Sequence, residues 1–169
     1  MFYNPHFESS LSSWRTWGLD VLDFFARHPD QYNLIFARHV KLFEQWLRRR
    51  ARLPRRFRSC PNFHIDLGSP ASADMTYTRA ADIYLGDVSS QVYEFLSDPR
   101  PCLFLNAHGV DWKQDPNYAQ WHFGPVLENI SRLGFALERA TADHTSFKGI
   151  QESAFADTFS FTEEPSTVT

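Results

Sequence analysis

Short apolar runs alternate with longer amphipathic segments along most of the chain. Five apolar runs end in glycine, proline or polar residues, which is typical of buried β-strands: 1–3, 32–36, 63–67, 83–85 and 102–105. Helices are predicted between these runs, over 14–25, 42–52, 76–81 and 92–96. Strands that alternate with helices predict an α/β fold, a Rossmann-like and mostly parallel sheet flanked by helices.

The first predicted helix shows the helical pattern most clearly. Its apolar residues recur with the period of an α-helix and form one face: Trp14, Trp17, Val21, Leu22 and Phe25. Ser12 or Ser13 is placed to cap the start of this helix, and the pair His28-Pro29 ends it. The first strand and this helix therefore form a βα unit.

The pattern changes after the fifth apolar run. Residues 112–123 are rich in Asp, Pro, Asn and aromatic side chains, which predicts a loop, and residues 126–142 have helical character. The last residues, 163–169, are predicted to form a frayed tail. We therefore expect one domain over residues 1–150 and a C-terminal segment, partly frayed, over residues 151–169.

Composition indicates one globular core in a reducing compartment. The 169 residues are 43% hydrophobic and 16% aromatic, enough for one substantial core and too apolar for a disordered chain. Cys60 and Cys102 have no CxxC spacing, and the chain carries neither a signal-peptide pattern nor an apolar run of the ~20 residues that a membrane span needs. A cytoplasmic protein is expected, with at most peripheral membrane contact.

The net charge of −3 hides one strongly basic segment. Seven arginines and no acidic residue lie in residues 48–58, so the rest of the chain is acidic. A solvated helix face is the interpretation we favour for this segment. The alternative is attraction to a polyanionic acceptor or to anionic lipid at the inner face of the membrane. The acidic remainder argues against a nucleic-acid partner.

The candidate chemistry lies where the predicted strands end. Parallel sheets bind ligands outside the carboxyl ends of their strands, and all five predicted strands end there in small or polar groups. These ends are Pro5-His6, Arg38-His39, Gly68-Ser69, Asp87 to Ser90 and Asn106 to Gly109. The corner Gly86-Asp87-Val88-Ser89-Ser90 opens a predicted helix, whose free N–H groups attract anions. We expect an anion site at this rim.

Residues 81–95, ADIYLGDVSSQVYEF, are followed by Arg100-Pro101 and resemble a motif of the CDP-glycerol glycerophosphotransferases. The runs FYNPHF at 2–7 and YNLIFARHV at 32–40 are similar to two strands of the same family. The resemblance implies the nucleotide-binding, C-terminal half of a glycosyltransferase B-type fold. It further implies an N-terminal domain, in the same parent chain or in a partner, without which activity is not expected.

The resemblance also implies roles for individual residues. Gly86, Asp87, Ser89 and Ser90 would hold the phosphates or polyol of a nucleotide-linked donor such as CDP-glycerol, which is a substrate rather than a cofactor. Arg38 and His39 would lie beside the pyrophosphate, with Ser69 at the same rim. His6 is the local candidate for a catalytic contact, and the acceptor, a polymer or glycan, would be activated by a base from the other half.

Departures from the family pattern leave the donor open. The turn at Arg38-His39 lacks both prolines of the family, and Val88 stands where the family has tyrosine. A nucleotide-sugar glycosyltransferase and a nucleotide-sugar epimerase therefore stay alternatives, as does a module that binds an anion or nucleotide without catalysis. A phosphoacceptor receiver domain ranks lowest, because Asn4-Pro5-His6 stands where that fold needs an acidic pair.

Each candidate residue also has a purely structural interpretation. Asp87, Ser89 or Ser90 can cap the following helix, and His39 can be a structural histidine. The aromatic residues of 112–123 can fix their loop to the core instead of stacking on a base. His108, Asp111 and His122 are too widely spaced for a recognisable metal motif, so no metal site is predicted.

Overall fold

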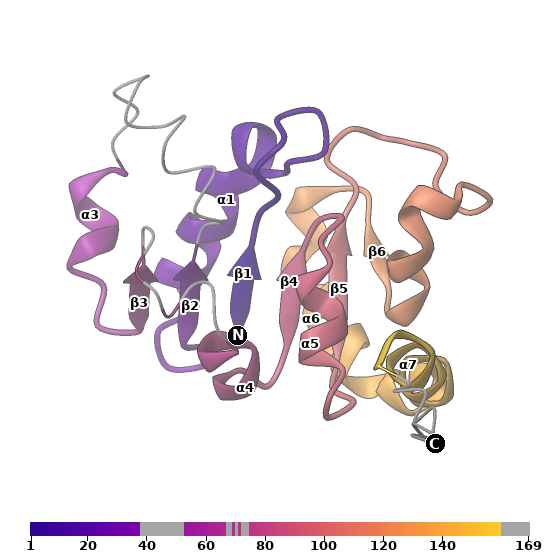
Figure 1. The fold of residues 1–169 in the computed structure, drawn as a ribbon. Coiled ribbons are helices and arrows are strands. Elements are labelled where there is room, and N and C mark those ends of the chain that lie inside the picture. Colours follow the sequence, from indigo (N-terminus) through magenta and orange to yellow (C-terminus); the bar gives the residue numbers. More distant parts are fainter. Residues whose placement is uncertain (38–52, 67–68, 70, 72–74, 160–169) are drawn as a thin grey trace, which may run out of the picture.

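The strands form one parallel sheet in a computed structural model, which describes residues 1–37, 53–66, 69, 71 and 75–159 (Figure 1). The six strands of this described part lie in the order β3-β2-β1-β4-β5-β6, and every neighbouring pair is parallel. Their bounds are β1 (Phe2–Asn4), β2 (Leu34–Ala37), β3 (Phe63–Asp66), β4 (Tyr84–Gly86), β5 (Cys102–Leu105) and β6 (Val126–Leu127). The predicted α/β, Rossmann-like fold is confirmed.

Helices cover both faces of this sheet. One face packs against α1 (Trp14–Ala26), α3 (Arg55–Arg58) and α6 (Leu133–Ala142). The other face packs against α4 (Thr76–Ala80), α5 (Gln91–Phe95), the 3₁₀ helix η2 (Pro116–Phe123) and α7 (His144–Phe159). A short 3₁₀ turn, η3 (Ile130–Arg132), leads into α6. The arrangement has three layers, with the sheet in the middle (Figure 1).

The alternation of side chains along a strand explains why there are two apolar clusters. In β5, Leu103 and Leu105 join the cluster under α1 and α6, whereas Cys102 and Phe104 join the cluster under α5 and η2. All four residues are buried, as expected for a central strand of a parallel sheet. Continuous apolar runs therefore gave correct strand predictions in the middle of the sheet.

Two predictions after β5 are wrong in part. Residues 112–123, predicted as a loop, contain η2, which starts after Asp115, where the carboxylate accepts a hydrogen bond from the Asn117 amide at 2.9 Å. Residues 126–142, predicted as helical, begin with the strand β6, and α6 starts only at Leu133. Two strand residues are too few to show a period in the sequence. The predicted helix at 42–52 and the tail at 163–169 lie outside the described residues.

The C-terminal helix α7 extends across residue 150, where we set the domain boundary. Its buried residue is Gln151, whose amide donates hydrogen bonds to the carbonyls of Phe123 at 2.7 Å and Arg100 at 3.1 Å. His144 shares a further bond with the Gln151 side-chain oxygen at 3.1 Å. A polar side chain thus attaches α7 to η2 and to the segment that leads into β5. None of the described helices is both long and apolar enough to cross a membrane.

Candidate functional site

The strand order places one crevice at the carboxyl edge of the sheet. From β1 the chain continues to β2 and β3 on one side, and from β4 to β5 and β6 on the other. The connections leaving β1 and β4 therefore diverge, which leaves a crevice between these two strand ends, where open α/β sheets bind ligands. The loop after β1 and the turn between β4 and α5 face each other there (Figure 1).

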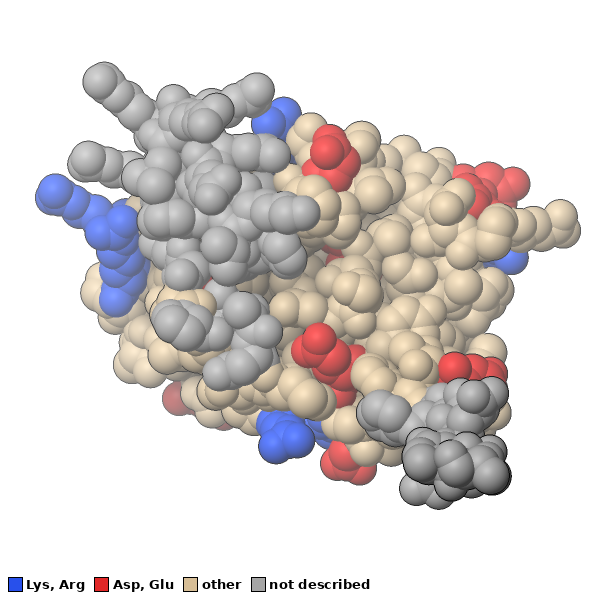
Figure 2. Space-filling model, viewed as in Figure 1, with Lys and Arg blue, Asp and Glu red and all other residues tan. Residues whose placement is uncertain are grey.

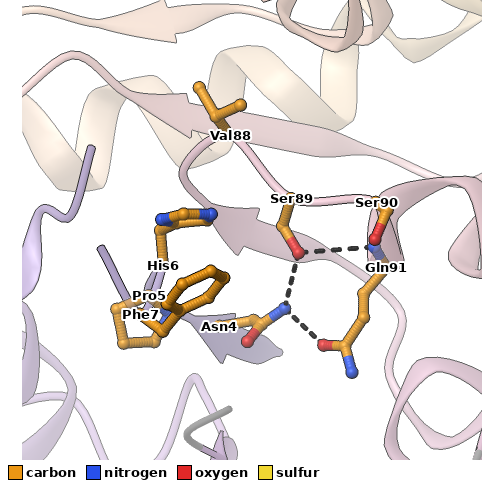
Figure 3. Close-up of a pocket in the computed structure, with 8 residues that line it drawn as sticks. All are labelled: Asn4, Pro5, His6, Phe7, Val88, Ser89, Ser90 and Gln91. Carbon is orange, nitrogen blue, oxygen red and sulfur yellow. Dashed lines mark hydrogen bonds between the residues drawn. The ribbon is translucent and has the colours of Figure 1, made fainter. Parts of the chain in front are cut away.

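A pocket of about 190 Å³ occupies this crevice. Figure 3 shows His6 and Phe7 on one side, the Ser89–Ser90 turn on the other and Asn4 between them. Within the part of the chain that the structure describes, the lining comes from two segments, residues 4–7 and residues 88–91. The structure therefore brings together the first and fourth of the five strand ends that the sequence analysis singled out.

The floor of the pocket is a hydrogen-bond network around Asn4, which is 3% exposed. Its side-chain amide donates to the Ser89 hydroxyl oxygen at 3.3 Å and to the side-chain oxygen of Gln91. The Gln91 backbone amide also donates to the Ser89 oxygen, at 3.3 Å. Both acceptor positions of the Ser89 oxygen are then occupied. Toward a ligand, this hydroxyl can therefore act only as a hydrogen-bond donor. A ligand here meets a neutral donor.

The turn before α5 differs from the expected anion site in one respect. The helix has five residues, Gln91–Phe95, so few peptide dipoles add up at its start. Ser89, not Ser90, takes the structural role at this turn through its bond from the Gln91 amide, and Ser90 makes no side-chain capping bond there. The Ser90 side chain is exposed at the pocket. Hydroxyl and imidazole donors, more than the helix dipole, would hold an anion here.

His6 is half-buried, and its ring orientation is defined by the backbone. The Nδ1 atom accepts a hydrogen bond from the Glu8 amide at 3.0 Å, and the ring stacks on Phe7 with a centroid distance of 4.4 Å. A neutral ring that accepts at Nδ1 carries its proton on Nε2. The structure therefore makes His6 a candidate for a ligand contact at the pocket, as a donor through Nε2.

Asp87 lies beneath this site and is fully buried, with 0% exposure. It is not one of the residues that line the pocket. Its Oδ2 atom accepts hydrogen bonds from the amides of His6 at 2.9 Å and Ser13 at 2.8 Å. Its Oδ1 atom accepts none within the described part of the chain. Burial raises the pKa of Asp87 to about 7, although the two amides and the Ser13 hydroxyl oppose this rise.

Two further contacts hold the loop after β1. The Ser13 hydroxyl shares a hydrogen bond with the Tyr3 hydroxyl at 2.9 Å, and His108 bonds through Nε2 to the Ser12 carbonyl at 3.1 Å. His108, which follows β5, thus has a structural role in holding this loop. Its neighbour Asn106 is buried and bonds to the amide and carbonyl of Val110.

The remaining predicted residues lie elsewhere. Ser69 follows β3, where its amide donates to the Asp66 carboxylate at 2.8 Å, and β2 and β1 separate it from β4. Gly86 is buried in β4; a Cβ atom there would come within 2.8 Å of the Tyr84 hydroxyl, so glycine is needed for packing. Arg38 and His39 lie outside the described residues.

Sequence reasoning missed Asn4, Phe7 and Gln91 as parts of the pocket. Asn4 ends β1, and this position at the carboxyl end of a strand was the available signal. No such signal marks Gln91, which is helical and whose role appears only in the network with Asn4. In the part of the chain that the structure describes, no three His, Cys, Asp or Glu residues are grouped closely enough to hold a metal ion.

The basic segment is described only in its last part. Arg55, Arg56 and Arg58 of α3 are exposed, and Figure 2 shows basic side chains at the edge of the molecule where α3 lies. Arg56 pairs with Asp23 of α1 at 3.1 Å, and its guanidinium lies 4.4 Å from the centre of the Phe57 ring. An exposed pair of this kind adds little to stability, which fits a solvated helix face.

Comparisons with protein-family models, with curated proteins and with solved structures found no match for this chain.

Proposed function

We propose that this domain binds the phosphate groups of a nucleotide-linked donor in the pocket between β1 and β4. The observation that carries the proposal is the convergence of His6, Ser89 and Ser90 on one pocket at the edge where the β1 and β4 connections diverge. Neutral donors at such a corner suit phosphate oxygens, which accept several hydrogen bonds and tolerate little desolvation without them.

The resemblance of residues 81–95 to the CDP-glycerol glycerophosphotransferases suggests the reaction. An acceptor hydroxyl would attack the β-phosphorus of the donor, forming a phosphate ester, while the bond to the bridging oxygen breaks and the nucleoside monophosphate leaves. The acceptor proton would pass to a base of the other half of the enzyme. Charge that develops on the leaving phosphate would be stabilised by donors such as Ser89 and His6. We expect no turnover by this domain alone.

Calorimetric titration with CMP, CDP, UMP and UDP tests the proposal. Saturable binding of a cytidine nucleotide supports a glycerophosphate donor, whereas a preference for uridine points to a sugar transferase or an epimerase-like domain. Binding without turnover, even after the other half is supplied, favours a recognition module. Failure of all four nucleotides to bind the folded chain contradicts the proposal.

Ser90→Ala and Ser69→Ala form a matched pair for locating the site. Both residues follow strands and both are exposed, but only Ser90 lines the pocket. We expect Ser90→Ala to weaken nucleotide binding roughly threefold to tenfold, the loss of one hydrogen bond. Ser69→Ala should leave the affinity unchanged. The reverse result would place the ligand at the β3 end of the sheet.

A further inference from the structure

Asp87 carries a carboxyl group in a position where it cannot act directly on a ligand in the pocket. It is 0% exposed and absent from the pocket lining, yet it lies directly under the loop that forms one side of the pocket. Its hydrogen bonds go to backbone amides, not toward the pocket. The sequence motif that led us to expect a ligand contact therefore calls for another explanation.

The two amides that Asp87 binds belong to opposite ends of one loop. His6 is the second residue after β1, and Ser13 is the N-cap residue of α1. A single carboxylate oxygen therefore joins the start of the loop to its end, and both to the end of β4. Hydrogen bonds from amides to a charged acceptor are roughly twice as strong as those to a neutral one.

We propose that Asp87 is a positioning residue that fixes the loop 5–13 over the end of β4 and thereby sets the His6 ring against the pocket. The importance of this role for binding rests on the proposed function above. The attachment of the loop to Asp87 does not rest on that proposed function, and it can be tested without a ligand. In metal sites, a carboxylate often orients a ligating histidine by accepting a hydrogen bond from its ring. Asp87 would orient His6 in a similar way, but through the His6 backbone amide.

The ionisation of Asp87 gives this contact a measurable signature. Among the described residues, the titratable side chains that face it are Tyr84 on β4, Tyr3 on β1, His6 in the loop and His108 after β5. Tyr84 is buried, and its pKa is raised by that burial, so it stays neutral. Protonation of Asp87 near pH 7 should then weaken both amide bonds together.

Amide chemical shifts measured by NMR across pH 5 to 9 test the attachment in the ligand-free chain. We expect the His6 and Ser13 amides to share a movement with a midpoint near pH 7 that is lost in Asp87→Asn, while any movement of the His6 amide caused by its own imidazole persists in that variant. The Val110 amide is the matched control, because it bonds to the uncharged Asn106 side chain at 2.9 Å and should not move. A Ser13 amide without a midpoint near pH 7, or a Ser13 movement that persists in Asp87→Asn, would overturn the proposal.

A pair of variants tests the consequence for the pocket. Asp87→Asn keeps an oxygen that can accept both amides, whereas Asp87→Ala keeps none. We expect ring ¹⁵N shifts to show His6 protonated mainly on Nε2 in the wild type and in Asp87→Asn, and to show a tautomer mixture in Asp87→Ala. A His6 ring unchanged in a folded Asp87→Ala would contradict the positioning role.

Sulfate, whose charge is constant over this pH range, serves as the probe of binding. Asp87→Ala should weaken sulfate binding by about tenfold, and Asp87→Asn by no more than about threefold. Equal losses in both variants would show that the affinity does not depend on the amide contacts that Asp87→Asn retains, which overturns the proposal. If the wild type binds neither sulfate nor a nucleotide, the proposed function fails, while the amide titration still decides the role of Asp87.

Discussion

A buried carboxyl such as Asp87 must be neutral or well supplied with donors. It has two amide donors on Oδ2, but Oδ1 has no partner among the described residues, and burial outweighs the amides. Its pKa of about 7 therefore lies well above the usual value of 3.8. The ionised form is less stable inside the protein than in the unfolded chain, although its hydrogen bonds are stronger.

The pH dependence of stability follows from this shift. Because the pKa of Asp87 is raised on folding, its favourable contribution is complete below about pH 4 and is lost as the pH rises to about 7. A shift of this size corresponds to a loss on the order of 4 kcal/mol. Urea unfolding between pH 4 and pH 8 should show this decline in the wild type and not in Asp87→Asn.

Asp20→Asn provides the control for that experiment. Asp20 lies on the exposed face of α1, so its variant should follow the wild-type curve at every pH. If Asp87→Asn shows the same decline as the wild type, the carboxyl is not a buried group with a raised pKa.

At the scale of elements, the close approach of backbones decides where glycine is needed. Gly124, just before β6, lies against the Cys102 carbonyl, and a Cβ atom there would collide with it. Gly149 lies within α7 and has open space around the position of a Cβ atom. The same substitution should therefore have opposite effects at these two positions.

Gly124→Ala is expected to destabilise the fold by about 1–3 kcal/mol, because β5 and β6 must separate to admit the methyl group. Gly149→Ala should stabilise it by about 1 kcal/mol through helix propensity. Urea denaturation of both variants at one pH measures the difference. A Gly124→Ala variant as stable as the wild type would mean that residues 124–127 are not held against β5 as described.

One buried amide, that of Gln151, contributes to the attachment of α7. Gln151→Ala would leave the carbonyls of Phe123 and Arg100 without their donor and would open a cavity, at a cost of about 2–4 kcal/mol. Gln114→Ala, at an exposed position in the loop after β5, should change stability by less than about 0.5 kcal/mol. Thermal unfolding compares the two variants. Equal melting temperatures would argue against the Gln151 contacts.

These elements show what the sequence could and could not predict. Apolar runs such as 102–105 match their strands because a central parallel strand is buried on both faces. β6 has only two residues, and α7 buries Gln151 instead of an apolar stripe, so neither shows a clear period. At the site, strand ends identified His6, Ser89 and Ser90. The burial of Asp87 was not predictable, because it depends on the path of the loop 5–13.

For the whole molecule, the question is where the folded domain ends. The second apolar cluster joins the sheet to α5 and η2, and the partly buried side chains of Ala154 and Phe155, from the part of α7 beyond residue 150, pack against it. Removing residues 151–169 would expose the residues that α7 covers and would leave the Phe123 and Arg100 carbonyls without Gln151. The boundary that we set at residue 150 from the sequence therefore lies within α7 (His144–Phe159), a helix whose residues beyond 150 contact the core.

Two shortened chains test this conclusion. A chain that ends at Phe159 keeps every residue of the two described clusters and should unfold in one cooperative transition close to that of the full chain. A chain that ends at Ile150 should melt many degrees lower or lose its cooperative transition, as circular dichroism and calorimetry would show. Equal stability of both chains would mean that α7 is an appendage and that the domain ends near residue 150. A loss for the shorter chain alone would show that α7 completes the three-layer fold, and that binding experiments on the β1–β4 pocket require it.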